Sequence, residues 1–194
     1  MNPNPNSNSP SPAPSNSARA WPEATDRLLH DPAFGPLVQR VGPVRLREPR
    51  GNAFQSLAAA IVYQQLAGRA ALTIHGRFVE ALDGDVAPDR ILAAPDDVLR
   101  AAGLSRNKMA ALRDLAAKVA SGEVELDGLA ALPDEAVVAS LTRVRGIGAW
   151  TAHMYLLFDL RRPDVWPTGD LGVRAGLVRV LGREAALAPA EMEL

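Results

Sequence analysis

The 194-residue sequence contains no cysteine. This excludes disulfide bonds, thiol catalysis, zinc ribbons and any iron–sulfur cluster held by cysteine thiolates. Aromatic residues make up only 5% of the chain, whereas 47% of it is hydrophobic, with Ala and Leu dominant. Because Ala and Leu favour helices while strands draw on aromatic and β-branched side chains, the composition favours a helical core.

Long apolar runs are also missing. No segment of the sequence reaches the ~18 apolar residues that a membrane span requires. The N-terminus shows no basic segment followed by an apolar one, so no signal peptide is evident. We therefore expect a soluble, cytoplasmic protein.

Net charge of one sign is nearly absent, because the formal charge is −1 at pH 7. The net charge of the chain therefore does not attract a polyanion strongly, and the local distribution of charge matters more for such binding. Between residues 141 and 183 the sequence holds seven arginines against three aspartates. This local excess is consistent with an anion-binding surface or with an ordinary solvated face, and charge alone leaves both open.

The N-terminal region predicts a tail followed by short helices. Residues 1–17 hold five Pro, five Asn and five Ser, a composition that cannot bury enough apolar surface to fold. Two short helices are predicted at 23–30 and 34–41, separated by Asp31 and Pro32. Residues 42–51, with two further prolines, are interpreted as a connector or lobe boundary.

The rest of the chain shows helical periodicity. Asn52 is predicted to cap a helix over 53–67, and Gln55 completes a capping box. The apolar residues of this helix recur at helical spacing, namely Phe54, Leu57, Ala58, Ile61, Val62 and Leu66. Lys108 and Arg113, in the longest of the later helices, are expected to be exposed. Strand-like alternation never exceeds four residues and no repeat has a fixed period, so the fold class is all-α. Further helices are predicted over 70–82, 88–94, 95–102, 106–120, 135–144 and 169–181, with an apolar one after the glycines at 146 and 148.

Residues 141–172 are the stretch around which the chain is organised. They read LTRVRGIGAWTAHMYLLFDLRRPDVWPTGDLG. Gly146 and Gly148 flank Ile147 and allow a tight turn that can approach a partner closely. The following helix begins with free N–H groups, which form an anion site. From these residues alone, a plain corner between two helices remains an alternative.

Four segments together resemble the helix-hairpin-helix DNA glycosylases, most of all the 3-methyladenine DNA glycosylase II (AlkA-type) branch. They are VRGIGAWTA, the WPTGDLG that places Asp170 twenty residues after Trp150, IVYQQLAGRAA at 61–71 and GLSRNKMAALRDLA at 103–116. The similarity extends over residues 52–177. It implies two helical lobes with the active-site cleft between them: 52–160 in one lobe, and 18–51 with 161–194 in the other.

The resemblance also implies an activity. Such an enzyme flips a damaged nucleotide out of double-stranded DNA and hydrolyses the bond to an alkylated purine, such as 3-methyladenine or 7-methylguanine, leaving an abasic site. Relatives that also cut the backbone carry a Lys where this chain has Trp150, so no lyase activity is expected. We expect a monomer that needs no organic cofactor. The alternatives are a DNA-binding module without catalysis, or a glycosylase for deaminated or oxidised bases.

The catalytic candidate is Asp170, whose carboxylate would stabilise an oxocarbenium-like sugar or orient the attacking water. Without the resemblance, Asp170 reads as an ordinary helix N-cap. The base pocket would be lined by Trp150, whose indole face attracts a cationic ring; the alternative is that Trp150 is an ordinary core residue. The other candidates for the pocket are Tyr63, Gln64 and Met154.

The resemblance further assigns contacts with the DNA backbone. A wedge that fills the place of the flipped base would come from Gln65 and Leu66, or else Leu66 belongs to the core. A Na⁺ or K⁺ ion would bridge phosphate and the carbonyls of Thr142, Val144 and Ile147. The phosphate grip itself would come from Gly146, Ile147, Gly148 and Thr151.

Overall fold

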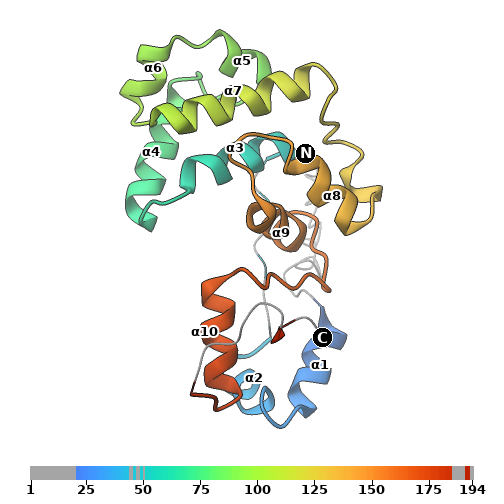
Figure 1. Cartoon of the computed structure of the whole chain (residues 1–194). Coiled ribbons are helices and arrows are strands. Elements are labelled where there is room, and N and C mark those ends of the chain that lie inside the picture. The colour runs from blue at the N-terminus through green and yellow to red at the C-terminus, as the bar shows by residue number, and fades with distance from the viewer. Residues whose placement is uncertain (1–20, 44–45, 47–48, 50, 185–190, 193–194) are drawn as a thin grey trace, which may run out of the picture. The chain divides into compact units, whose positions relative to one another are not determined.

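The computed structural model describes residues 21–43, 46, 49, 51–184 and 191–192; the tail predicted at 1–17 lies outside them. Within these ranges all regular structure is helical, which confirms the all-α prediction. None of the helices described is long and apolar enough to cross a membrane. The helices are α1 (Pro22–His30), α2 (Gly35–Val41), α3 (Ala53–Tyr63), α4 (Gly68–Glu80), α5 (Pro88–Ala93), α6 (Asp96–Ala101), α7 (Arg106–Ala120), the 3₁₀ turn η2 (Leu129–Ala131), α8 (Asp134–Leu141), α9 (Ala149–Phe158) and α10 (Leu171–Val180) (Figure 1).

The chain divides into two compact units, Met1–Glu48 and Pro49–Leu194. In the first unit α1 packs against α2. The turn between them is held by Asp31, whose Oδ1 accepts hydrogen bonds from the amides of Ala33 and Phe34. The combination of 18–51 with 161–194 in one lobe stays a prediction.

The second unit begins with α3, which is capped as predicted. The Asn52 side chain accepts from the Gln55 amide, and the Gln55 side chain accepts from the Asn52 amide, each over 3.0 Å. Its buried face is the one expected from the helical spacing, namely Phe54, Leu57, Ala58, Ile61 and Val62.

The predicted end of this helix at residue 67 is wrong, because α3 stops at Tyr63. Gln65 adopts a left-handed conformation with φ of 57°. In addition, the Lys108 ammonium donates to the Val62 carbonyl over 2.8 Å and so satisfies one of the last carbonyls of the helix. A contact from another helix thus helps to end α3.

The core of this unit is built around α7. Helices α3, α5 and α6 all pack on it, and Leu112, Leu115 and Ala116 are fully buried there. Figure 1 shows α7 running between α3 and the α5–α6 pair. The expectation that Lys108 and Arg113 are exposed is wrong, since both are half-buried.

Arg113 shows the physical reason for that correction. Its guanidinium donates to the carbonyls of Leu92 and Ala94 at the end of α5, over 3.1 and 2.7 Å. Long cationic side chains can bury their stems while the charged head satisfies carbonyls at a helix terminus.

Candidate functional site

The hairpin predicted from the glycines occupies residues 142–148, between α8 and α9. Val144 and Ile147 are 1% and 3% exposed and fix the turn to the core. Gly146 has φ of 80°, and a Cβ atom there would lie 3.1 Å from the Cβ of Ala111 on α7. Glycine is therefore required at 146 both by its conformation and by the closeness of α7.

The amides of the hairpin fall into two groups. Those of Arg145 and Ile147 donate to protein acceptors, namely the Asp114 carboxylate and the Val144 carbonyl. By contrast, the amides of Gly146 and Gly148 donate to no acceptor in the described part of the chain. Together with the free N–H groups in the first turn of α9, they can bind an anion.

The side chains predicted to contact DNA differ in how they are placed. The side chains of Ile147 and Thr151 are buried, so only their backbone atoms are available to a ligand. Gln65 is exposed and Leu66 is half-buried, in the loop between α3 and α4.

The carbonyls of the hairpin also differ in whether they accept a hydrogen bond. Those of Arg143 and Gly146 accept hydrogen bonds from Lys118 and from Gln64. The Val144 carbonyl accepts only from the Ile147 amide, and those of Thr142 and Ile147 accept from none of the described residues. The three carbonyls predicted to hold a monovalent cation thus keep free lone pairs, and carbonyl oxygens suit Na⁺ or K⁺ chemically.

Asp170 lies beside Trp150. It is the N-cap of α10, because its Oδ1 accepts from the Val173 amide over 2.8 Å. Its other oxygen, Oδ2, accepts from the Trp150 indole N–H over 2.6 Å. The plain N-cap and the catalytic candidate are compatible, because capping uses Oδ1, and Oδ2, which accepts from Trp150, can still accept a second hydrogen bond.

The same contacts keep Asp170 ionised. The Trp150 hydrogen bond and, after it, the Val173 amide lower the pKa of the Asp170 carboxyl below its ordinary value, against an opposing effect of burial. The N-terminus of α10 also favours a negative charge. Trp150 is 48% exposed, so its indole is not an ordinary core side chain in this unit.

The other candidates for the base pocket lie on two helices. Met154 is half-buried one turn after Trp150 on α9. Tyr63, at the end of α3, stacks on His75 of α4 with ring centroids 5.3 Å apart. Gln64, the next residue, donates from Nε2 to the Gly146 carbonyl over 2.9 Å. Of these residues, Trp150 thus contacts Asp170, and Gln64 contacts the hairpin.

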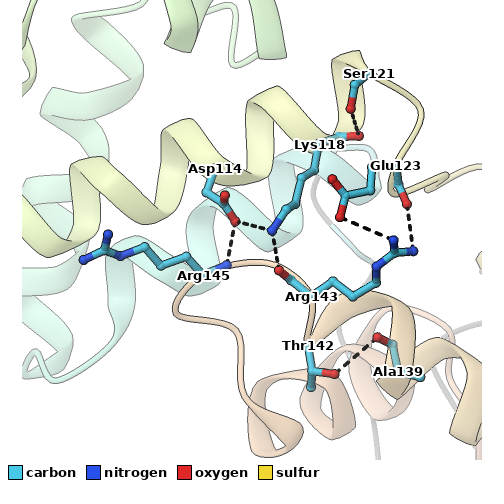
Figure 2. Close-up of polar contacts among 8 residues, drawn as sticks. All are labelled: Asp114, Lys118, Ser121, Glu123, Ala139, Thr142, Arg143 and Arg145. Carbon is cyan, nitrogen blue, oxygen red and sulfur yellow. Dashed lines mark hydrogen bonds and ion pairs between the residues drawn. The ribbon is translucent and has the colours of Figure 1, made fainter.

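Sequence reasoning missed the contribution of α7 to this site. Asp114 accepts from the Arg145 amide, and Lys118 donates to the Arg143 carbonyl (Figure 2). Burial raises the pKa of Asp114, but hydrogen bonds from Arg145 and Lys118 and their charges outweigh it and lower the pKa overall. The only signal in the sequence was the four-residue spacing of Asp114 and Lys118, which is common on solvated helix faces.

Comparisons with known proteins identify the family and the fold. The family described as HhH-GPD superfamily base excision DNA repair protein matches residues 58–194. DNA-3-methyladenine glycosylase 1 of Schizosaccharomyces pombe is 34% identical over 146 residues, which cover 72% of this chain and 64% of that protein. The chain thus spans less than two thirds of the length of this curated relative.

Solved structures show the same fold. The DNA-3-methyladenine glycosidase of Bacillus halodurans superposes with a TM-score of 0.77 at 32% identity, over 89% of this chain and 79% of that one. The S. pombe 3-methyladenine DNA glycosylase in complex with abasic DNA gives 0.76 at 29% identity, over 86% and 84%. The family match, the hairpin and the overall superposition lead to one conclusion: the chain belongs to the HhH-GPD superfamily of base excision DNA repair proteins.

Proposed function

We propose that the chain is a monofunctional DNA glycosylase. It flips alkylated purines, of the 3-methyladenine and 7-methylguanine type, out of double-stranded DNA and releases them by hydrolysis, leaving an abasic site for base-excision repair. The observation that carries this proposal is the contact of Asp170 with Trp150, which sets an ionised carboxylate beside an exposed aromatic ring directly after the hairpin. The relatives named as 3-methyladenine glycosylases support it.

Asp170 supplies the negative charge. As the bond between sugar and base breaks, the deoxyribose becomes oxocarbenium-like, and a fixed carboxylate stabilises that cation electrostatically. The same carboxylate can orient or deprotonate the attacking water. Both roles need the ionised form, which the Trp150 and Val173 hydrogen bonds favour.

Trp150 supplies the surface for the base. An alkylated purine carries positive charge and is electron-poor, and an indole face attracts such a ring by about 0.5–2 kcal/mol. Met154, Tyr63 and Gln64 complete the pocket in this proposal. Since the alkylated base is already a good leaving group, no strong general acid is required.

The hairpin holds the DNA backbone. The free amides of Gly146 and Gly148 donate hydrogen bonds to phosphate oxygens, and a Na⁺ or K⁺ on the carbonyls of Thr142, Val144 and Ile147 would add a positive charge there. Gln65 and Leu66 fill the gap that the flipped base leaves. The enzyme acts as a monomer.

We propose no lyase activity because Trp150 provides no amine nucleophile. Cutting the sugar–phosphate backbone through a Schiff base needs an amine nucleophile. An indole nitrogen has no free lone pair for this reaction, and here its N–H is committed to Asp170. The reaction therefore ends at the abasic site.

The test is base release from defined duplexes. The full chain is incubated with duplex DNA treated with a methylating agent, and the freed bases are separated by chromatography. Parallel duplexes carry hypoxanthine, uracil or 8-oxoguanine. We expect free 3-methyladenine and 7-methylguanine, with strands that stay intact until alkali is added. Binding without release of any base would favour the DNA-binding module, and release from the parallel duplexes alone would favour the glycosylase for other lesions.

A further inference from the structure

Helix α7 carries a carboxylate that contacts the backbone of the hairpin. Asp114 Oδ2 accepts a hydrogen bond from the Arg145 amide over 2.7 Å and another from the Lys118 ammonium over 3.0 Å. Lys118 also donates to the Arg143 carbonyl. Figure 2 shows these contacts, through which Asp114 and Lys118 of α7 bind two peptide groups of the hairpin.

These contacts are long-range and partly shielded. Asp114 is 31 residues from Arg145 in sequence, and Lys118 is 25 residues from Arg143. The side chains of Lys118 and Asp114 are only 21% and 30% exposed. Hydrogen bonds to charged groups in such positions are stronger than those on an open surface.

The negative charge of Asp114, which is paired with Lys118, cannot itself attract DNA. A carboxylate next to a phosphate-binding turn repels the phosphate, whereas the cationic side chains of a DNA-binding surface attract it. Any contribution of Asp114 to binding therefore has to act through geometry. The amide that it engages belongs to Arg145, directly before Gly146, whose own amide is free.

We propose that Asp114 is a positioning residue for the hairpin. Its Oδ2, supported by Lys118, fixes the peptide groups at 143–145 and so presets the amides of Gly146 and Gly148 for a phosphate before DNA arrives. This role rests on the proposed function for its purpose, but its geometric part concerns the free protein. Preorganised donors bind more tightly because less freedom is lost on association.

Two substitutions at 114 separate charge from geometry. Asp114→Asn keeps an oxygen that can accept from the Arg145 amide but removes the negative charge. Asp114→Ala removes both. Asp96→Ala is the matched control, because Asp96 pairs with Arg113, another cation of α7, over 2.6 Å and has no contact with the hairpin.

The first readout is the Kd for a duplex that contains an abasic site. We expect Asp114→Ala to bind about five- to tenfold more weakly, which is a part of the strength of one charge-assisted hydrogen bond, because the lost order of the hairpin must be regained on binding. Asp114→Asn should bind as tightly as the wild type or more tightly, and Asp96→Ala should stay within about twofold. At saturating DNA, the single-turnover rate of base release should be the same for all four proteins.

The second readout is amide hydrogen exchange of the free protein. Residues 143–148 should exchange faster in Asp114→Ala and at the wild-type rate in Asp96→Ala. An Ala variant that binds DNA as tightly as the wild type or more tightly, with unchanged exchange at 143–148, overturns the proposal. If the wild type binds DNA but releases no base, the proposed function fails, while the Kd and exchange comparisons still decide the role of Asp114.

Discussion

The indole N–H of Trp150 donates to the carboxylate of Asp170 over 2.6 Å, and these two residues lie twenty positions apart, on α9 and at the start of α10. The contact holds the catalytic candidate by one oxygen, while the Val173 amide holds the other. A carboxylate bound at both oxygens is confined to one orientation and stays ionised. In the proposed reaction, the protein fixes this charge before the substrate arrives, so little reorganisation is needed when positive charge develops on the sugar.

Trp150→Phe should shift the pH dependence of base release. Phe keeps an aromatic face for the base but cannot donate to Asp170, so the largest cause of the lowered pKa is lost. A carboxylate with a lowered pKa is active above that pKa and fails as the pH falls through it, so the acidic limb should move to higher pH. The measurement is the single-turnover rate between about pH 3.5 and 7, where carboxyls titrate, corrected for spontaneous release. An acidic limb at the same pH in both proteins would contradict this role of the indole.

The two glycines of the hairpin should respond differently to alanine. Gly146→Ala places a Cβ at φ of 80° and 3.1 Å from Ala111, so we expect a loss of about 1–2 kcal/mol in the free energy of unfolding. A Cβ on Gly148 meets nothing within 4 Å in the free protein. Gly148→Ala should therefore keep its stability and lose DNA affinity, because the methyl group would stand where a phosphate approaches. Urea unfolding and a DNA titration of both variants distinguish the two effects, and equal unfolding losses would contradict this account.

Lys108→Met should destabilise the second unit. Its ammonium satisfies the Val62 carbonyl at the end of α3, and methionine keeps most of the apolar stem. We expect a loss of about 1–3 kcal/mol, the usual penalty for a partly buried acceptor left without a donor. The control is Arg106→Met on the exposed first turn of α7, which should stay within about 0.5 kcal/mol. Urea unfolding measures both, and a Lys108 variant as stable as its control would count against the cap.

Asp159→Asn should gain stability relative to the wild type as the pH rises. Burial raises the pKa of Asp159, with an opposing effect of the Ser56 hydrogen bond. The folded protein therefore holds the proton more tightly than the unfolded chain, and the wild type loses stability as the pH rises through this raised pKa. The Asn variant lacks that loss, so its advantage should be largest near pH 7 and vanish near about pH 4. Urea unfolding at pH 7 and at about pH 4 measures this difference in stability. The control is Asp164→Asn, because Asp164 is exposed. A stability gain of Asp159→Asn that is the same at both pH values would contradict the raised pKa.

Local signals explain what could be predicted from the sequence. The capping box of Asn52 and Gln55 and the turn at Gly146 are formed by residues near one another in the chain, and both are present as expected. The apolar spacing of α3 likewise identified its buried face. The resemblance of four ordered segments to a known family predicted that Asp170 and Trp150 lie together. The structure shows the two side chains in contact, and their roles stay predictions.

The features that could not be predicted depend on backbone atoms of distant segments. Lys108 reaches a carbonyl 46 residues away, and Asp114 reaches an amide 31 residues away. A backbone carbonyl or amide has no sequence signature, so a cation or carboxylate that serves one looks like any solvated charge. The end of α3 was missed for the same reason, because Leu66 continues the apolar spacing while the Lys108 contact and the conformation of Gln65 end the helix at Tyr63.

The most direct test of the account is the rate of base release by Asp170→Asn at saturating methylated duplex, measured beside its Kd for the same DNA. Asparagine keeps one oxygen for the N-cap bond to Val173, but it loses the charge and the hydrogen bond that Oδ2 accepts from Trp150. We therefore expect a loss of about 0.5–1.5 kcal/mol in the free energy of unfolding and little change in Kd. The single-turnover rate of the variant should lie at least about 100-fold below that of the wild type. A variant that releases 3-methyladenine at the wild-type rate would contradict it.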